Sequence, residues 1–488
     1  MTFRGMRQSL LNTFTEIYIF NLHGNSKKKE VAPDGSKDEN VFDIQQGVTI
    51  SIFIKEAGKT SHAKVHYADL WGKREGKYLV LAETDINLTK WNELEPTSPH
   101  YLFVPQDINL LSEYEKGWKI TDISPINSTG IVTARDGFVI GLEQASVQKR
   151  LEIFLDKKLG DTEVQNQLSL SENYMWRVTE ARKQLMAIND WESFFKRILY
   201  RPFDYRSIYY HPSVVWRTRS NVMRHMMAGN NIGLYTNREV NGEFHHILCS
   251  RDIINDCTVS LQTKERTYIF PLYLYPVEGE MQLDKGNRRP NFNSEFIKVF
   301  SEKLGLKFIE DGKGDLQETF GPEDIFNYAY AVFHSPDYRS RYVEFLRRDF
   351  PRLPLTSDKV LFKLLAEKGA TLVSLHLMES PLLNNLITKY EVKGDHTVDK
   401  VNYDEKTQRV SINKTQCFEG VPPEVWNFHI GGYPVCEKWL KDRKGRKLTI
   451  DDIAHYQEIV VALKETIRLM QEIDEAIESH GGWPVAFD

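Results

Sequence analysis

The sequence lacks the features that mark membrane, secreted and zinc-binding proteins. Its 488 residues include only four cysteines, which form no Cys-x-x-Cys pair and have no His-x-x-x-His partner. Zinc therefore has little support, and reduced thiols are expected. No stretch approaches 18 apolar residues, and residues 1–20 lack the apolar run and small-residue cleavage site of a signal peptide. We expect a cytoplasmic protein with no membrane partner and no bound metal.

An excess of positive charge is also missing. Lysine and arginine total 63 against 68 aspartates and glutamates, which gives a formal net charge of -5. No global field therefore draws the chain to nucleic acid, and any contact with DNA requires a local basic surface. The hydrophobic share of 41% nevertheless indicates folded domains with large cores rather than disorder.

Recognisable catalytic motifs are absent as well. The segment Leu22–Lys29 (LHGNSKKK) does not meet the phosphate-loop pattern G-x-x-x-x-G-K-[ST]. The order of residues suggests no Ser/His/Asp constellation and no internal repeat. We therefore predict no catalytic, cofactor-binding or metal-ligating residue in this chain.

What the sequence does contain is a segment rich in arginine and aromatic residues, from Leu199 to Pro276. Arginine presents a planar fork of donors that suits phosphate oxygens and guanine edges, and aromatic rings offer stacking faces. A solvated face of an ordinary globular domain is the alternative. The DNA-binding candidates in this segment are Arg201, Arg206, Arg217, Arg219 and Arg238.

Local patterns divide this segment into elements. Residues 215–227 suit a short helix, which could carry arginines and His225 into a major groove, although its methionine stripe is more typical of a core. Two alternating runs flank Asn241-Gly242, a pair typical of a two-residue hairpin turn. The adjacent His245 and His246 would point to opposite faces of their strand, which disfavours a joint metal site.

A second basic patch follows Gly431-Gly432, beside Tyr433 and Trp439. A compact, glycine-broken run of cations can bind phosphates without reading bases, although a solvated turn would explain it too. Thr449, with Asp452 three residues later, predicts the cap of a long helix that reaches about Ala476. The DNA-binding candidates here are Lys438, Lys441, Arg443, Lys444 and Arg446.

The remaining chain alternates between helical and strand patterns. Residues 4–14 predict a helix, and 16–24 and 47–55 predict apolar strands, which together make half of an α/β sheet. Residues 144–198, 291–300 and 323–350 have helical periodicity, and 356–378 predicts a helix pair. Thr129, Thr133, Arg135 and Asp136 would line a groove or sit on an exposed turn. Ser335 before Pro336 predicts a helix cap.

Long phrases in residues 4–55, 200–275, 323–354 and 409–456 resemble the C-terminal part of Type ISP restriction-modification enzymes and their type IIG relatives. The first phrase is similar to the distal part of an N6-adenine methyltransferase domain. The resemblance implies an α/β remnant of a class I methyltransferase sheet over residues 1–140. It implies a larger mixed α+β target-recognition domain over residues 141–488.

The resemblance also implies a function: sequence-specific recognition of double-stranded DNA within a restriction-modification adenine methyltransferase. The family's Pro-Pro-Tyr loop and glycine-rich cofactor loop are not in this sequence, so S-adenosylmethionine is expected only for the complete methyltransferase. Two alternatives stay open. The chain could complement a separately encoded N-terminal methyltransferase or helicase-nuclease half, or it could be an interaction module that does not bind DNA.

The two basic regions suggest a division of labour. Arg217, Arg219 and Arg238 would discriminate bases because a helix and a hairpin hold them stiffly. The cations of the KDRKGR run would contribute affinity alone, because a flexible turn cannot hold a bidentate geometry. The members assigned to affinity are Lys441, Arg443 and Arg446.

Overall fold

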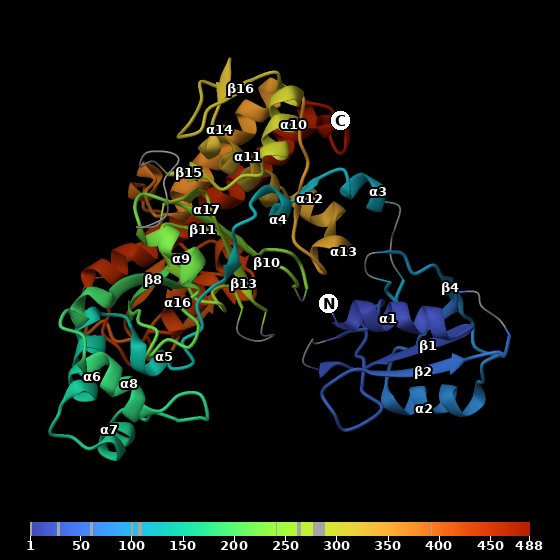
Figure 1. The fold of residues 1–488 in the computed structure, drawn as a ribbon, viewed down its shortest axis with the longest axis horizontal. Coiled ribbons are helices and arrows are strands. Elements are labelled where there is room, and N and C mark those ends of the chain that lie inside the picture. Colours follow the sequence, from blue (N-terminus) through green and yellow to red (C-terminus); the bar gives the residue numbers. More distant parts are fainter. Residues whose placement is uncertain are drawn as a thin grey trace. The chain divides into compact units, whose positions relative to one another are not determined.

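The computed structural model describes residues 2–26, 30–58, 62–98, 101–105, 110–240, 242–260, 265–276, 288–391 and 393–488. The chain divides into two compact units, Met1–Asn109 and Leu110–Asp488. The first is blue in Figure 1, and the second runs from cyan to red. Each is described by itself.

The smaller unit is a four-stranded sheet of order β2-β1-β3-β4. Strand β1 runs parallel to β3 and antiparallel to β2, and β4 is antiparallel to β3. Helices α1 and α2 lie on opposite sides of the sheet (Figure 1). The bounds are Thr2–Thr13 (α1), Glu16–His23 (β1), Val48–Ile54 (β2), Lys64–Asp69 (β3), Arg74–Glu83 (α2) and Asn92–Leu94 (β4). The helix and two strands expected from residues 4–55 are therefore present.

A buried ion pair ties α2 to the loop after β1. Lys77 Nζ lies 2.7 Å from Asp38 Oδ1, and neither side chain is exposed. The ammonium also donates to the carbonyl oxygen of Leu22, and Asp38 Oδ2 accepts the backbone N–H of Gly24. Because both charges are paired and hydrogen-bonded, they are tolerated in the interior.

The described residues of the larger unit form three four-stranded sheets, of which two have the orders β11-β10-β13-β6 and β12-β8-β9-β7 and the third comes from residues 389–419. Every described pairing in them is antiparallel except that between β12 and β8. The bounds are Ser128–Thr129 (β6), Ile140–Gly141 (β7), Phe195–Arg201 (β8), Asp204–Tyr209 (β9), Gly233–Asn237 (β10), Ile247–Ser250 (β11), Ile253–Ile254 (β12) and Thr267–Pro271 (β13). Strands β6 and β7 come from residues before 142, so the structural division at 109/110 precedes the boundary expected at residue 140.

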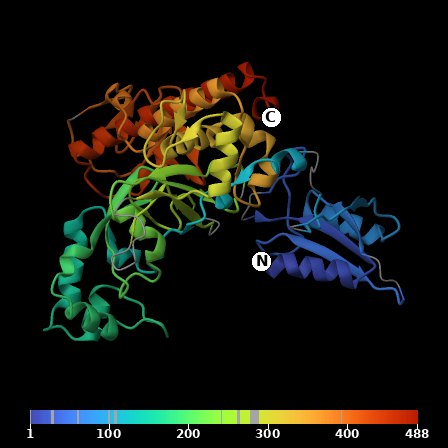
Figure 2. The same cartoon turned by 45° about the horizontal axis from the view of Figure 1, so that its top comes forward.

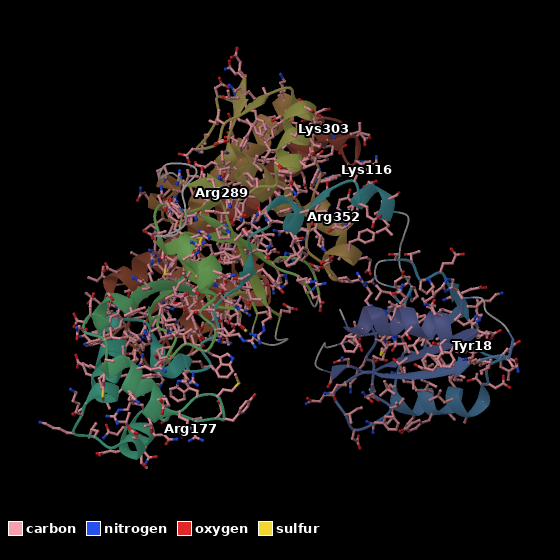
Figure 3. The ribbon with its side chains drawn as sticks, in the orientation of Figure 1. Tyr18, Lys116, Arg177, Arg289, Lys303 and Arg352 are labelled. Carbon is pink, nitrogen blue, oxygen red and sulfur yellow. The ribbon has the colours of Figure 1, made fainter. Side chains whose placement is uncertain are left out.

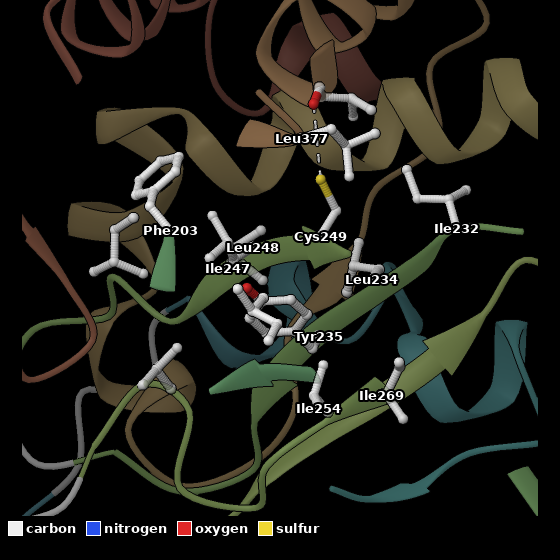
Figure 4. Packing of buried hydrophobic residues seen from close by; sticks show 14 of the residues in the cluster. Phe203, Ile232, Leu234, Tyr235, Ile247, Leu248, Cys249, Ile254, Ile269 and Leu377 are labelled. Carbon is white, nitrogen blue, oxygen red and sulfur yellow. Dashed lines mark hydrogen bonds between the residues drawn. The ribbon is translucent and has the colours of Figure 1, made fainter. Parts of the chain in front are cut away.

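The first of these sheets is buried on both faces. Leu234 on β10 pairs with Cys249 on β11, and the Cys249 thiol points toward the helix Lys359–His376, where it donates to the carbonyl oxygen of Val373 at 3.9 Å (Figure 4). Tyr235 and Ile269 are paired positions on the opposite face. Burial raises the pKa of Cys249 to about 12, so this cysteine is a packing residue.

Helices Pro322–His334 (α11) and Lys359–His376 (α14) pack against strand β11, and Ile450–Ser479 (α17) packs against both of these helices. A Cβ on Gly369 of α14 would lie 1.8 Å from the carbonyl oxygen of Asn327 on α11, so only glycine fits where these backbones cross. Tyr330 and His376 share a 2.5 Å hydrogen bond, and His376 Nε2 lies 2.9 Å from Thr466 Oγ1. Burial lowers the pKa of His376 to about 3, so the ring that links the three helices is neutral.

A helical arm, residues 144–186, leads into β8 (Figure 1). The buried Arg182 holds it together: Nε donates to the carbonyl oxygen of Phe154, and Nη2 donates to those of Asp156 and Leu159. The expected helical region at 144–198 thus ends earlier, because Phe195 already begins β8. The arm's helices are Gln144–Leu155 (α6), Asp161–Gln167 (α7) and Val178–Met186 (α8).

Several other helical expectations are confirmed, with one change. The Ser335 side chain accepts the N–H of Tyr338, and the capping box of Thr449 and Asp452 begins α17. Residues 356–378 form one helix instead of a pair. Further elements of the larger unit include Ser220–Met227 (α9), Ser294–Leu304 (α10), Pro336–Arg341 (α12), Val343–Leu346 (α13), Lys389–Tyr390 (β19), Asn402–Asp404 (β20), Arg409–Ser411 (β21), Cys417–Glu419 (β22) and Val435–Lys441 (α16).

The hairpin expected at Asn241-Gly242 is wider than predicted. Strands β10 and β11 do pair, but the last paired residues are Thr236 and Ile247, so no two-residue turn joins them. The intervening chain is held elsewhere: Val240 N–H donates to the carbonyl oxygen of Arg347. Asn241 itself lies outside the described residues.

Candidate nucleic-acid interface

The two basic regions meet at one buried carboxylate, that of Asp204. Its partner Arg443 is 239 residues away in the sequence. Asp204, at the start of β9, is 2% exposed. Its Oδ1 accepts from Arg443 Nη2 at 3.0 Å, and its Oδ2 accepts from Arg206 at 2.7 and 2.9 Å. The red C-terminal segments lie beside the green strands of this sheet in both views (Figures 1 and 2). Patches that the sequence presents as separate are therefore one structural feature.

Arg443 belongs to the interior of this feature. It is 5% exposed, its guanidinium stacks 3.4 Å from the ring centre of Trp439, and burial lowers the pKa of the guanidinium. Its Nη1 also donates to the carbonyl oxygen of Trp439. Arg443 is thus a scaffold residue and not an exposed phosphate contact, which corrects the expectation of a flexible turn.

Arg201 is likewise turned inward. It is 4% exposed, donates to Asn255 Oδ1 at 3.3 Å and lies 3.9 Å over the ring of Tyr200. Arg206 is less buried, and its guanidinium also lies over the Tyr200 ring, 4.1 Å from the ring centre. Burial keeps Arg201 out of direct reach of a duplex, and Arg206 is already neutralised by Asp204.

The exposed cations of the C-terminal patch are mostly paired. Lys438 lies 2.6 Å from Asp442 and Lys441 lies 2.5 Å from Glu437, each at i,i+4 spacing on or beside α16. Arg446 lies 2.8 Å from Glu143. Lys444 is exposed and forms no ion pair with the described part of the chain.

Arg217 differs from these paired cations because its side chain is exposed and its backbone is fixed by a neighbouring segment. Its backbone forms an isolated bridge with Val132, through N···O distances of 2.9 and 3.0 Å, and its side chain is exposed. It makes no ion pair with any described residue. Arg217 therefore precedes α9 on an extended segment and does not lie on a helix over 215–227, because pairing with Val132 overrides the helical period.

Arg219 and Arg238 complete the predicted set. Arg219 has a φ of 55°, is half-buried at the start of α9, and its Nε has no hydrogen-bond partner among the residues described. Arg238 is exposed and lies 3.4 Å from Asp349. The structure thus brings Arg217 and Arg219 together on one short segment, whereas Arg238 lies on the loop after β10.

The histidines near these arginines have partners within the protein. His225 is buried on α9, its Nδ1 accepts the N–H of Tyr275, and burial, with a contribution from Arg224, lowers its pKa to about 4. His245 pairs with Glu243, whereas His246 pairs with Glu265, so the two rings have separate partners. No candidate metal cluster occurs within the described ranges, and no described helix is long and apolar enough to cross a membrane.

Sequence reasoning missed the contact between Arg135 and Trp176. The Arg135 guanidinium lies 3.5 Å from the Trp176 ring centre, and Trp176 Nε1 donates to the carbonyl oxygen of Ser213 at 2.7 Å. Thr133 and Arg135 are buried, so residues 129–136 form neither an open groove nor an exposed turn. These contacts fix the helical arm against residues 211–217. No local pattern could have indicated them, since they join three distant segments.

The chain is thus a mixed α/β protein, and its larger unit combines several sheets with packed helices and an exposed arginine at position 217. The chain belongs to the family of the Type ISP C-terminal specificity domain, whose model matches residues 122–472. No curated protein matches it.

Solved structures show the same fold. One is an ATP-dependent Type ISP restriction-modification enzyme, LlaBIII, bound to DNA, with TM-score 0.71 and 19% identity. Another is a nuclease-deletion mutant of the Type ISP enzyme LlaGI in complex with a DNA substrate mimic, with TM-score 0.66 and 20% identity. A third is a DrdV–DNA complex, with TM-score 0.69 and 20% identity. The matches cover 96% of this chain but only 31%, 37% and 49% of those chains.

Proposed function

We propose that this chain is the target-recognition part of a restriction-modification adenine methyltransferase and that it binds double-stranded DNA. The family match over residues 122–472 supports this function, as do the DNA complexes named for proteins of similar fold. The net charge of -5 does not oppose it, because a local surface can bind phosphates.

The observation that carries the assignment is the presentation of Arg217. Its side chain is exposed and free of ion pairs with described residues, while two backbone hydrogen bonds to Val132 fix the segment. A guanidinium on a fixed backbone can hold the bidentate geometry that guanine or phosphate recognition needs. Arg219 adds a second cation two residues later.

Titration of a labelled random duplex at several salt concentrations tests the proposal. Wild-type protein should bind at micromolar concentration in low salt. Arg217→Ala should lower the affinity and reduce the slope of log K against log salt by about one. Arg468→Ala is the matched control, because Glu465 and Glu472 already neutralise this exposed arginine of α17.

Absence of binding to any duplex in low salt would refute the proposal and favour an interaction module that does not bind DNA. Once a target sequence is known, base reading becomes measurable. Arg217→Ala should then cost about 1–3 kcal/mol on the target and little on random DNA. Equal losses on both would make Arg217 a backbone contact.

For the smaller unit we propose the distal part of a class I methyltransferase sheet. Parallel β1 and β3, antiparallel β2, and helices on both faces support this assignment. S-adenosylmethionine would bind the complete methyltransferase, because the sequence has no glycine-rich cofactor loop or Pro-Pro-Tyr loop.

A second candidate function is complementation of a separately encoded half. Strand β2 forms an edge of its sheet, and Ile50, Ile52 and Phe53 on it are 37–39% exposed. An exposed apolar edge strand favours pairing with another chain. Adding a polypeptide with the missing loops should then yield methyl transfer from S-adenosylmethionine to DNA. Ile52→Lys should abolish the transfer, whereas Val31→Lys, at another exposed site, should not.

A further inference from the structure

A turn of the helical arm displays two large apolar side chains to solvent. Tyr174 is 92% exposed and Met175 is 61% exposed, in the connection between α7 and α8. At this exposure the Tyr174 ring contributes little to packing within the fold. We call residues 173–176 the Tyr174 turn; it precedes Arg177, which Figure 3 labels on the arm.

The Tyr174 turn is firmly anchored. The Asn173 side-chain oxygen accepts the N–H groups of Met175 and Trp176 at 2.8 and 2.9 Å, and Asn173 and Trp176 form a backbone bridge. Glu172 Oε1 accepts the N–H of Val178 at 2.6 Å. Trp176 is only 8% exposed. The two apolar side chains are therefore held outward on a fixed backbone, which lowers the ordering cost of any contact they make.

The anchor also connects this turn to the candidate interface. Trp176 stacks on Arg135 and donates to Ser213, and the chain from Ser213 continues to Arg217. Arg177, at the N-cap of α8, is exposed and has no ion pair within the part of the chain that the structure describes. The exposed Tyr174 and Met175 side chains thus lie next to Arg177 in sequence, and Trp176 links them to the segment that leads to Arg217.

We propose that the Tyr174 turn is a base-stacking wedge, which contacts unstacked bases of a bound duplex. The inference rests on the proposed DNA-binding function. Every base offers a π-face to an aromatic side chain, and apolar wedges that enter base steps are a known way to kink or open duplex DNA. The adjacent Arg177 supplies the positive charge that a polyanion requires, whereas two side chains on a turn are too small an area for a stable protein interface.

The test compares two labelled duplexes of one sequence by fluorescence anisotropy in low salt. One is fully paired and the other has a central two-nucleotide mismatch, which leaves bases free to stack. Wild-type protein should prefer the mismatched duplex by about 5- to 150-fold, the factor that corresponds to stacking of one base. Tyr174→Ala should abolish the preference, and Tyr174→Phe should retain it.

Ile450→Ala is the matched control, because Ile450 is 78% exposed at the start of α17. It should leave the preference unchanged. Equal affinity of wild-type protein for both duplexes, or a preference that survives Tyr174→Ala, would overturn the wedge while leaving DNA binding intact. Failure of wild-type protein to bind either duplex would instead overturn the proposed function, and the wedge with it.

Discussion

Asp204→Asn should destabilise the larger unit more than any surface substitution. The change keeps the shape of the side chain but removes the charge that compensates Arg443 and Arg206. Arg443 is 5% exposed, and its nearest other carboxylate is Asp452 at 3.7 Å. Arg206 is less affected, because it is partly solvated and lies 4.0 Å from Asp442.

The magnitude follows from the burial of Arg443. Removing one partner of a buried ion pair costs about 3–5 kcal/mol, and the residual attraction to Asp452 favours the lower end, about 3 kcal/mol. A unit of about 380 residues has an unfolding entropy near 0.8 kcal/mol/K, so its Tm should fall by about 4 °C. Replacing both partners, as in Asp204→Asn with Arg443→Met, should cost less than the sum of the single changes.

Urea unfolding and thermal scans of the wild type, the two single variants and the double variant test this prediction. Arg468→Met supplies the control, with an expected change within about 0.5 kcal/mol, because its ion pairs are exposed. A loss below about 1 kcal/mol for Asp204→Asn would refute the reasoning. So would single losses that simply add, since the pair would then have no measurable coupling.

Three further outcomes are expected. Gly369→Ala should destabilise the larger unit by about 1–3 kcal/mol or more in urea unfolding, because its Cβ would overlap the carbonyl oxygen of Asn327; a neutral effect would show that the helices separate freely. Burial raises the pKa of Asp474 to about 6, so its native carboxyl binds a proton that the unfolded chain has lost, and stability should fall as pH rises from about 4 to 6. Asp474→Asn should flatten that pH dependence, and an unchanged slope would contradict the assignment. Lys77→Met should destabilise the smaller unit by about 3–5 kcal/mol in thermal scans, because Asp38 would be left buried and uncompensated; a Tm unchanged from wild type would count against it.

Local signals in the sequence predicted local structure well. Thr449 with Asp452 predicts a helix start because the cap is made within four residues, and the structure has the reciprocal capping box. Apolar runs at 16–24 and 47–55 likewise predicted β1 and β2. The helix expected over 215–227 begins instead at Ser220, since residues 216 and 217 bond to Thr133 and Val132. A contact with residues about 85 positions away cannot be inferred from the periodicity of apolar residues within one segment.

The contrast between local and distant contacts also explains why the sequence did not reveal the extent of the candidate interface. Counting arginines and lysines predicted two cationic regions, but many of these charges are paired by carboxylates, some within the same helix and some from distant segments. Asp204 pairs with Arg443, Glu143 pairs with Arg446, and Glu379 holds Arg251. Composition cannot tell a paired guanidinium from a free one, because the pairing is set by the fold. The proposed interface is consequently smaller than the sequence implies, and recognition of a duplex would depend on a few fixed groups such as Arg217 more than on total charge.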